Sequence, residues 1–530
     1  MPPYSTRSLS ILAGERGWLL AVAGAILLAF FLRLGAYPLF DLDEGAFSQA
    51  TQEMIASGNY LTTTLDGAPR YDKPIFSYWM QAASVHLFGT REWAFRLPSA
   101  IAASLWVLAV FVFLRSRAGA AGAGAAALLI ALAAGPLVIG RSATADAWLN
   151  LWLALTFLEI ARWSEDPRRP TLLRAYLWMG LGFLTKGPVA IAIPLLASLL
   201  FFLSEKRSRD WLRAAFDVRG WVVLAAVTLP WYGLVFLREG GGFFYGFFIE
   251  HNLQRFTETR EGHGGTPFYY LLALPLVLSP FIGWLLSALR RLAWRPRGLE
   301  RFAWIWFFVV FVLVSLSSTQ LPHYVLYGVT PLMVILALHR EQFTNAWLAF
   351  VPPVLVFVLL LLVPEILKLV LAQLDRAYEI ELAERGLQIF DGSYRLAIAL
   401  FLMASIAVIL LLRRLAVWRR LLLIGALQAA AITLVFIPAA ADMQQVPVKQ
   451  AAEIARTLDR PVVAFNIKMP TFSVYLGSAT PRRMPQPGEL AITRAHGVAA
   501  VIDAHPGHPV EIHYHQGGIV LLEVHPREGR

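Results

Sequence analysis

Long apolar runs separated by short polar segments dominate the chain. A transmembrane helix needs ~20 apolar residues, and tilting accommodates somewhat shorter or longer runs. Runs of this kind cover residues 18–35, 96–114, 119–139, 146–161, 172–184, 187–203, 220–237, 267–289, 302–317, 321–338, 346–364, 395–412 and 421–438. The pattern therefore predicts a polytopic α-helical membrane protein with about thirteen transmembrane helices.

Lysine and arginine cluster in the polar segments at regular intervals, which predicts the orientation. Cytoplasmic loops retain positive charge, whereas exported loops are depleted of it. The basic segments are residues 115–117, 162–170, 205–213, 290–297, 339–340 and 413–420. Placing all of them inside gives a cytoplasmic N-terminus and an exported C-terminus. The run at 18–32 precedes Arg33 and lacks a small-residue cleavage pattern, so we expect a first transmembrane helix rather than a signal peptide.

This orientation places the unusual polar residues on one side of the membrane. The expected outer segments are residues 36–95, 141–146, 185–188, 238–266, 318–324 and 365–394, and the tail from 441. A site assembled from them would lie at the outer membrane boundary, where a lipid headgroup and an acceptor can meet.

The first outer segment, residues 36–95, does not have the composition of a disordered loop. Residues 46–58 and 76–89 carry apolar side chains at helical spacing, and we expect amphipathic helices on the membrane surface. Turn-forming residues and a Lys-Pro step between them should make Asp72 and Lys73 project from a fixed bend. Lys73 could be an interfacial lysine with no further role, but its acidic and basic neighbours favour phosphate binding.

The tail changes character after Pro438. Residues 448–467 read as a helix followed by a buried strand, and GVAAVID, VEIHYHQ and IVLLEV read as further strands. We therefore expect two domains, a transmembrane domain over residues 1–440 and a small α/β domain over residues 441–530. Four histidines in the tail match no standard metal-site spacing, and exposed strand positions explain them better; they are His505, His508, His513 and His515.

Composition agrees with a membrane protein. Hydrophobic residues make up 57% of the 530 residues and charged residues 15%, against roughly 25% charged in soluble domains. The net charge of +11 accompanies 13% aromatic residues, which suits membrane interfaces better than nucleic-acid binding. The chain has no cysteine, which excludes disulfides, thiolate metal sites and cysteine nucleophiles. It also contains no P-loop, which disfavours a nucleotide-sugar donor.

Four motifs, in order along the chain, resemble a known family. They are the acidic pair Asp43 and Glu44, the YDKPIFSYW block at 71–79, RLPSA at 96–100, and the R-x-x-x-x-D of Arg141 to Asp146. Together they resemble the GT-C membrane glycosyltransferases that use polyprenyl-phosphate sugars, the group of the protein O-mannosyltransferases and the bacterial aminoarabinose transferase for lipid A. The resemblance covers residues 20–340. It implies a GT-C fold in the bacterial inner membrane.

The resemblance implies that Asp43 is the catalytic carboxylate. A carboxylate beside the acceptor can take its proton as general base; an acceptor that is already an anionic phosphate would leave Asp43 an orienting role. Helix N-capping by Asp41 or Asp43 is the structural alternative. Asp146 is expected to have a second acidic role, with capping of its own helix as the alternative.

Cations should bind the departing polyprenyl phosphate. We expect Lys73 and Arg255 to do so, although Arg255 could instead be an interfacial anchor. Lys186 is a third candidate, because a lysine on the exported side is disfavoured without a function. The remaining residues that we expect to line the substrate pocket are Glu44, Arg70, Tyr71, Asp72, Arg141, His323 and Tyr324.

We expect no required cofactor. His251 and Asp72, beside Glu250, raise the alternative of a divalent metal, because relatives of the aminoarabinose type use this neighbourhood for one. A site with one histidine has no distinctive spacing, so a hydrogen-bonded network is favoured.

The sequence therefore predicts an inverting glycosyltransferase that is a monomer, contacts membrane lipids and binds no nucleic acid. Its donor is a sugar on undecaprenyl or a related polyprenyl phosphate, and its acceptor is lipid A or another lipopolysaccharide component. A protein or cell-wall glycan acceptor stays open. A transporter or flippase of lipid-linked saccharides is the alternative class, which predicts charges buried within spans and an internal repeat.

Overall fold

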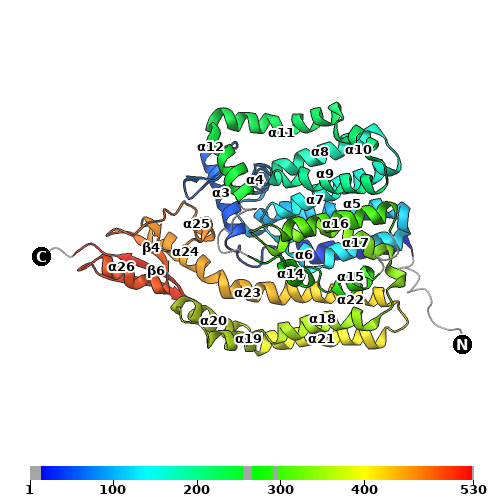
Figure 1. Ribbon diagram of the computed structural model, residues 1–530. Coiled ribbons are helices and arrows are strands. Elements are labelled where there is room, and N and C mark those ends of the chain that lie inside the picture. Colours follow the sequence, from blue (N-terminus) through cyan, green and yellow to red (C-terminus); the bar gives the residue numbers. More distant parts are fainter. Residues whose placement is uncertain (1–13, 255–264, 291–295, 528–530) are drawn as a thin grey trace.

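The computed structural model describes residues 14–254, 265–290 and 296–527. Most of the helices lie along a common axis, and a small sheet lies at one end of the bundle (Figure 1). Among the described residues, five helices are long and apolar enough to cross a membrane, or six if one pair bent by 53° forms a single span. The expected count of thirteen spans is not confirmed, because other apolar runs form shorter or broken helices.

The first half of the chain supplies helices α2 to α12. A break at Gly119, where φ is 68°, interrupts the long helix α5. This break separates the two apolar runs that the sequence predicts at 96–114 and 119–139. The helices are α2 (Glu15–Ile26), η2 (Leu27–Phe31), α3 (Asp43–Ser57), α4 (Phe76–Phe88), α5 (Glu92–Leu132), α6 (Ala134–Arg141), α7 (Asp146–Glu165), α8 (Arg169–Lys186), α9 (Val189–Ser204), α10 (Ser208–Ala215), α11 (Val218–Glu239), α12 (Gly241–Phe244) and η3 (Tyr245–Leu253).

The second half continues the bundle with more bent helices. Their cores pack against the first half through buried aromatic residues, and Trp106 Nε1 donates a hydrogen bond to Thr330 Oγ1 at 2.7 Å. The helices are α14 (Tyr269–Val277), α15 (Ile282–Leu289), α16 (Gly298–Ser315), η5 (Pro322–Gly328), α17 (Val329–Leu338), η6 (Arg340–Gln342), α18 (Ala346–Leu361), α19 (Val363–Leu371), α20 (Ala377–Ile389), α21 (Gly392–Leu411), α22 (Val417–Ala431), η7 (Ile432–Phe436) and α23 (Ile437–Gln444).

The first loop is folded, as predicted. Its two expected helices are α3 and α4, and the bend between them contains the hairpin of β1 (Thr64–Leu65) and β2 (Ala68–Pro69). Asp66 and Gly67 form the two-residue turn with φ of 52° and 77°, the conformation that Asp-Gly favours in a tight hairpin. Helix α3 is largely buried rather than exposed on a surface.

The tail forms a four-stranded sheet in the order β3-β4-β6-β5, with β3 and β4 parallel and the other pairs antiparallel. The predicted strand GVAAVID is wrong: it forms helix α26, where Ala499 and Ala500 favour a helix. Residues 490–494 form a strand of the sheet instead. The elements are α24 (Val446–Leu458), β3 (Val462–Ala464), α25 (Pro470–Leu476), β4 (Leu490–Arg494), η8 (Ala495–Gly497), α26 (Val498–Ala504), β5 (Val510–Gln516) and β6 (Ile519–Val524).

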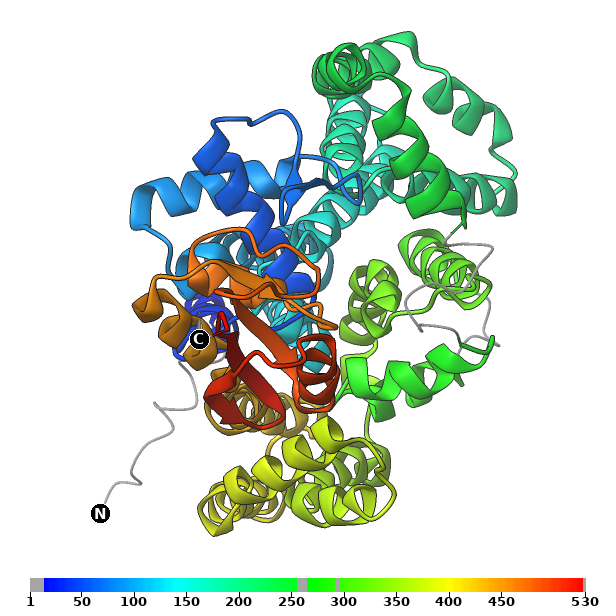
Figure 2. The ribbon, with the colours of Figure 1, turned by 90° about the vertical axis from the view of Figure 1, so that its left-hand side faces the viewer.

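The sheet region and the first loop lie at the same end of the bundle. Viewed from that end, the orange and red tail covers the middle of the molecule and adjoins the blue first loop (Figure 2). The division of the chain into domains at residue 440 stays a prediction.

Candidate active site

Asp43 begins helix α3 without capping it. The N-cap residue is Leu42, and the cap position makes no side-chain hydrogen bond, so the capping alternative for Asp41 and Asp43 is wrong. Within the described residues, the Asp43 carboxylate forms no hydrogen bond or ion pair, and it faces an open cavity. A carboxylate that makes no hydrogen bond within the protein is free to accept a proton or a hydroxyl hydrogen bond.

Glu44, the next residue, has very different surroundings. It is 4% exposed and forms a two-pronged ion pair with the buried Arg96, with both N–O distances 2.8 Å. Its oxygens also accept hydrogen bonds from the backbone N–H of Phe40 at 2.9 Å and of Ala143 at 2.7 Å. Donors within the protein thus occupy both carboxylate oxygens, so Glu44 anchors the start of α3.

Arg141 is buried in the same way. Its guanidinium donates to the backbone carbonyls of Ala29 at 2.9 Å and Leu32 at 2.8 Å, and to the hydroxyl of Tyr37 at 3.3 Å. It thereby fixes the end of the first helix. Arg141 and Glu44 contribute to a cavity wall, but their charged groups are already satisfied.

Asp72 is the centre of a cluster of three basic residues. Its carboxylate contacts Arg70 Nη2 at 2.8 Å, Lys73 Nζ at 2.8 Å and His251 Nδ1 at 3.2 Å. Tyr71 forms a separate contact, donating its hydroxyl to Glu239 Oε2 at 2.9 Å. The predicted bend thus brings Asp72 and Lys73 together and joins them to π-helix η3.

Asp146 is the centre of a second cluster. It begins α7, and its carboxylate contacts Lys186 Nζ at 2.6 Å. His323 Nε2 lies 3.7 Å away, and the hydroxyl of Tyr327 lies 3.5 Å away. Lys186 also lies over the ring of Tyr324, with its Nζ 5.2 Å from the ring centroid. Capping of α7 does not explain Asp146, because its carboxylate pairs with α8 instead.

One cavity of about 640 Å³ brings these groups together. It combines side chains from the first loop, α7, α8, η3 and η5, which are far apart in sequence. The predicted site residues that line it are Asp43, Arg70, Tyr71, Asp72, Lys73, Asp146, Lys186, His251, His323 and Tyr324. The central cavity is therefore lined both by a carboxylate that makes no hydrogen bond or ion pair among the described residues and by several cationic groups.

Two apolar cavities adjoin this central cavity. One, of about 270 Å³, includes Lys73, Lys186 and His251 at its polar end and is lined by residues such as Ile193 and Val314. We call it the Ile193 cavity.

The other apolar cavity, of about 560 Å³, shares Asp43, Asp146 and His323 with the central cavity. It extends between apolar side chains that include Val138 and Ile437, and we call it the Val138 cavity. Each apolar cavity could hold a hydrocarbon chain whose headgroup reaches the central cavity.

The donors at Asp72 and His251 fit a metal poorly. Only these two side chains meet, and Asp72 already contacts two cations. No group of three histidine, aspartate or glutamate residues with metal-binding geometry occurs in the described part of the chain. Zinc sites in proteins use three or four side chains, so we assign no chemical step to a metal.

Arg255 lies outside the described residues, so its expected place beside Lys73 is not tested. Sequence reasoning also missed several residues that line the central cavity. They are Asp41, Lys468, Pro470 and Arg482, three of which come from the tail. The tail carries no motif that points to the cavity, so only the folded chain shows their position.

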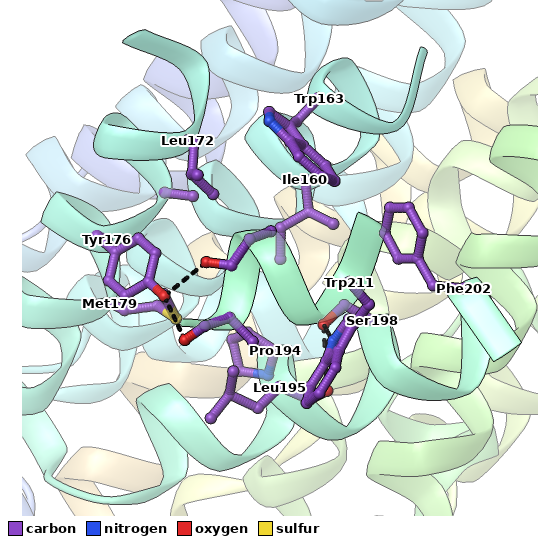
Figure 3. A pocket seen from close by; sticks show the side chains of 13 residues that line it. Ile160, Trp163, Leu172, Tyr176, Met179, Pro194, Leu195, Ser198, Phe202 and Trp211 are labelled. Carbon is purple, nitrogen blue, oxygen red and sulfur yellow. Dashed lines mark hydrogen bonds between the residues drawn. The ribbon is translucent and has the colours of Figure 1, made fainter. Parts of the chain in front are cut away.

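A further cavity of about 40 Å³ lies between helices α7 to α10 and is almost entirely apolar (Figure 3). Its polar groups are satisfied: the Tyr176 hydroxyl donates to the carbonyls of Ala214 and Ala215 at 2.9 Å, and Trp211 Nε1 donates to Ser198 Oγ at 3.0 Å. No charged residue is among those lining it, so it is not a candidate for the chemistry.

Known proteins resemble this chain in sequence and in fold. The family model for dolichyl-phosphate-mannose-protein mannosyltransferases matches residues 72–233. The undecaprenyl phosphate-alpha-4-amino-4-deoxy-L-arabinose arabinosyl transferase of Aeromonas salmonicida is 31% identical over 61% of this chain and 61% of that relative. Its counterpart in Edwardsiella ictaluri is 29% identical over 62% of this chain and 60% of that relative. The chain thus matches about three fifths of the length of these relatives.

Solved structures extend the likeness over nearly the whole chain. ArnT from Cupriavidus metallidurans bound to undecaprenyl phosphate superposes with a TM-score of 0.80 at 21% identity, covering 96% of this chain and 98% of that one. Its apo state gives a TM-score of 0.76 at 22% identity, covering 96% and 97%. The chain is therefore a multi-pass membrane protein with the GT-C fold of ArnT, similar in sequence to the aminoarabinose transferases.

Proposed function

We propose that this protein is an inverting glycosyltransferase that moves a sugar from undecaprenyl phosphate, or a related polyprenyl phosphate, to an acceptor. One observation carries the proposal: Asp43, whose carboxylate makes no hydrogen bond or ion pair among the described residues, lines the same central cavity as Lys73, and this cavity adjoins two apolar cavities. The names of the relatives, which describe undecaprenyl-phosphate sugar transferases, support it.

The chemistry assigns one role to each side of the central cavity. An acceptor oxygen attacks the anomeric carbon while the bond from that carbon to the phosphate oxygen breaks, and the configuration inverts. Asp43 takes the proton of an acceptor hydroxyl as general base. Polyprenyl phosphate leaves with the bonding electrons, and Lys73 stabilises its negative charge. If the acceptor is an anionic phosphate, Asp43 orients it and takes no proton.

Lys186 completes the proposed phosphate site among the described residues, and Arg255 stays a candidate from the sequence alone. The Lys186 ammonium lines both the central and the Ile193 cavities, and it is held by Asp146 at 2.6 Å. Asp146 therefore positions a cation beside the donor headgroup. Arg255 follows π-helix η3, which carries His251 into the cavity wall.

The two apolar cavities favour a lipid acceptor over a protein or a cell-wall glycan. A single lipid-linked donor needs one hydrocarbon chamber, and the Ile193 cavity meets the cationic side of the site. The Val138 cavity meets Asp43, where the acceptor must lie. We therefore propose that it receives an acyl chain of lipid A or of another lipopolysaccharide component.

The proposal includes the location of the protein and its orientation in the membrane. The protein lies in the bacterial inner membrane as a monomer, with its N-terminus in the cytoplasm and with the central cavity and tail facing the periplasm. The spacing of the basic segments along the chain, which the positive-inside rule assigns to the cytoplasm, supports this orientation. It needs no cofactor and binds no nucleic acid.

Mass spectrometry of lipopolysaccharide and polyprenyl-linked lipids tests the proposal. Cells lacking the gene are complemented with the wild-type chain or with Asp43→Asn. Loss of one sugar from an acceptor, accumulation of its lipid-linked donor, and failure of Asp43→Asn to restore the sugar are the expected results. Unchanged glycans in the deletion strain would refute transferase activity.

A further inference from the structure

Helix α25 of the tail contacts the first loop at the segment that carries Asp43. The backbone N–H of Thr471 donates to Asp41 Oδ1 at 3.0 Å, and the Thr471 hydroxyl donates to Asp41 Oδ2. These residues are 430 positions apart in sequence. Thr471 is fully buried, so its hydroxyl has no solvent to replace this carboxylate.

Two more side chains of helix α25 form hydrogen bonds with the first loop. Ser473 Oγ donates to Asp66 Oδ1, in the turn of the β1–β2 hairpin, at 2.8 Å. The Tyr475 hydroxyl accepts from the backbone N–H of Leu39 at 2.7 Å. Helix α25 is thus hydrogen-bonded to the loop at two places, just before Asp43 and at the hairpin that leads to Lys73.

The packing at Gly45 is an independent sign that this contact is close. A Cβ atom at Gly45 would lie 2.7 Å from the backbone nitrogen and from Cγ2 of Thr471, and 2.7 Å from Asp41 Oδ1. Such a distance is shorter than real carbon contacts allow, so only glycine lets α25 approach α3. Figure 2 shows the orange tail lying against the blue first loop.

The consequence concerns the orientation of Asp43. Its carboxylate makes no hydrogen bond or ion pair within the described residues, and the charges of Arg70 and His323 act on it over a longer range, so the backbone of residues 41–44 is the main determinant of its direction. Arg96 holds this segment on one side, through Glu44. Thr471 holds it on the other side, through Asp41. Reactions of this kind lose rate when a reacting group is misplaced by as little as ~1 Å.

Resting on the proposed function, we propose that α25 is a positioning element of the active site, in which Thr471, through Asp41, orients Asp43 for transfer. Thr471 and Asp41 are positioning residues, since neither needs to touch a reacting atom. The tail then contributes to the rate of transfer rather than to donor binding.

The test uses the full-length protein in lipid nanodiscs. Thr471→Val removes the hydroxyl and keeps the shape, and Thr471→Ser restores the hydroxyl. Exposed Thr457 on α24, whose hydroxyl bonds only to the carbonyl of Ile454 at 2.7 Å, gives the matched control Thr457→Val. We expect Thr471→Val to lower kcat about 10-fold or more with an unchanged KM for the lipid-linked donor. Thr471→Ser should recover most of the rate, and Thr457→Val should match the wild type.

A second readout does not depend on activity. The chain has no cysteine, so Leu42→Cys gives one spin-label position within the segment before Asp43. Label mobility should increase in Thr471→Val and stay low in Thr457→Val. Unchanged mobility or an unchanged kcat in Thr471→Val would overturn the positioning role.

Two further cases keep the tests separable. If Thr471→Val does not fold, Ser473→Ala replaces it with the same expected signs and the same refuting results; it removes the bond to Asp66 together with the bond to the Thr480 hydroxyl inside the tail. If the wild-type protein transfers no sugar, the proposed function fails, whereas the label mobility still decides whether α25 holds the loop.

Discussion

Asp43 and Glu44 are neighbouring carboxylates for which the structure predicts opposite consequences of removing the charge. Asp43→Asn removes a carboxylate that makes no hydrogen bond or ion pair among the described residues. Its stability should therefore change by no more than about 0.5 kcal/mol, as for substitutions away from buried contacts. Its rate should fall by about 10²–10⁴, the contribution of a general base.

Glu44→Gln should give the reverse. The Glu44 oxygens accept four hydrogen bonds, two from Arg96 and one each from the backbone N–H groups of Phe40 and Ala143. A glutamine amide would place N–H donors against two of these donors and leave the Arg96 guanidinium buried without a counter-charge. Removing one partner of a buried ion pair costs about 3–5 kcal/mol, so the melting temperature should drop by several degrees.

Both variants are measured in nanodiscs, by product formation from an undecaprenyl-phosphate sugar and by thermal unfolding. We expect Asp43→Asn to lower the rate of transfer and Glu44→Gln to lower the melting temperature, and the comparison of the two variants tests both roles. A rate within about threefold of wild type for Asp43→Asn would refute its role as a base, because even the weakest general bases contribute more. An unchanged melting temperature for Glu44→Gln would refute the anchoring role.

Three other changes probe the walls of the site. Lys186→Met should destabilise the protein by about 3–5 kcal/mol by leaving Asp146 buried without its cation, and the double variant with Asp146→Asn should regain most of the loss in thermal unfolding. Burial raises the pKa of Asp41 from its ordinary 3.8 to about 7, so between pH 4 and 7 the folded protein binds one more proton than the unfolded chain, and its stability should fall as the pH rises. Asp41→Asn should flatten this dependence when melting temperatures are measured across that range. A melting temperature of the wild type that rises from pH 4 to 7 would contradict the raised pKa. Arg482 is an exposed cation that lines the central cavity, so Arg482→Gln should raise the KM for at least one of the two substrates, and an unchanged KM for both would show that it binds neither.

Local patterns in the sequence were sufficient to predict much of this fold. Helical spacing in the first loop predicted α3 and α4, and the turn residues between them predicted the bend that presents Asp72 and Lys73. Assigning the polar segments to one side of the membrane brought Asp43, Asp146 and Lys73 into one site, and all three line the central cavity. Each of these inferences depends on neighbours in sequence or on a rule about loops.

Contacts between distant segments could not be predicted in this way. The approach of Thr471 to Asp41 depends on how a sheet packs against a loop 430 residues earlier, and no periodicity records it. Likewise, the motif Asp43–Glu44 does not reveal that one carboxylate faces a cavity and the other a buried arginine. That difference follows from the start of α3, where successive side chains point in different directions around the helix axis.

The tail shows the limit of reading short apolar runs. GVAAVID and LAITR are both short and apolar, and periodicity alone does not separate a short strand from a short helix. Pairing decides the outcome: residues 490–494 lie between β3 and β6 in the sheet, whereas residues 498–504 form α26. The alanines in the second segment then favour the helix.

The assignment of the two apolar cavities can be tested with a matched pair of substitutions. Val138 lines the Val138 cavity and Ala192 lines the Ile193 cavity, and both side chains are exposed, so a tryptophan at either position should not overpack the core. Val138→Trp should raise the KM for a lipid acceptor and leave the donor KM unchanged. Ala192→Trp should do the reverse, because a bulky ring would displace the polyprenyl chain next to Lys73.

Steady-state kinetics with each substrate varied in turn separates these effects. The opposite pattern would exchange the two cavities and place the donor beside Asp43, which contradicts the proposed roles of Asp43 and Lys73. A water-soluble acceptor lacking acyl chains provides the control, since its KM should not respond to Val138→Trp. If its KM rises as much as that of the lipid acceptor, the Val138 cavity does not hold an acyl chain, and the preference for a lipid acceptor over a protein or a cell-wall glycan loses its structural basis.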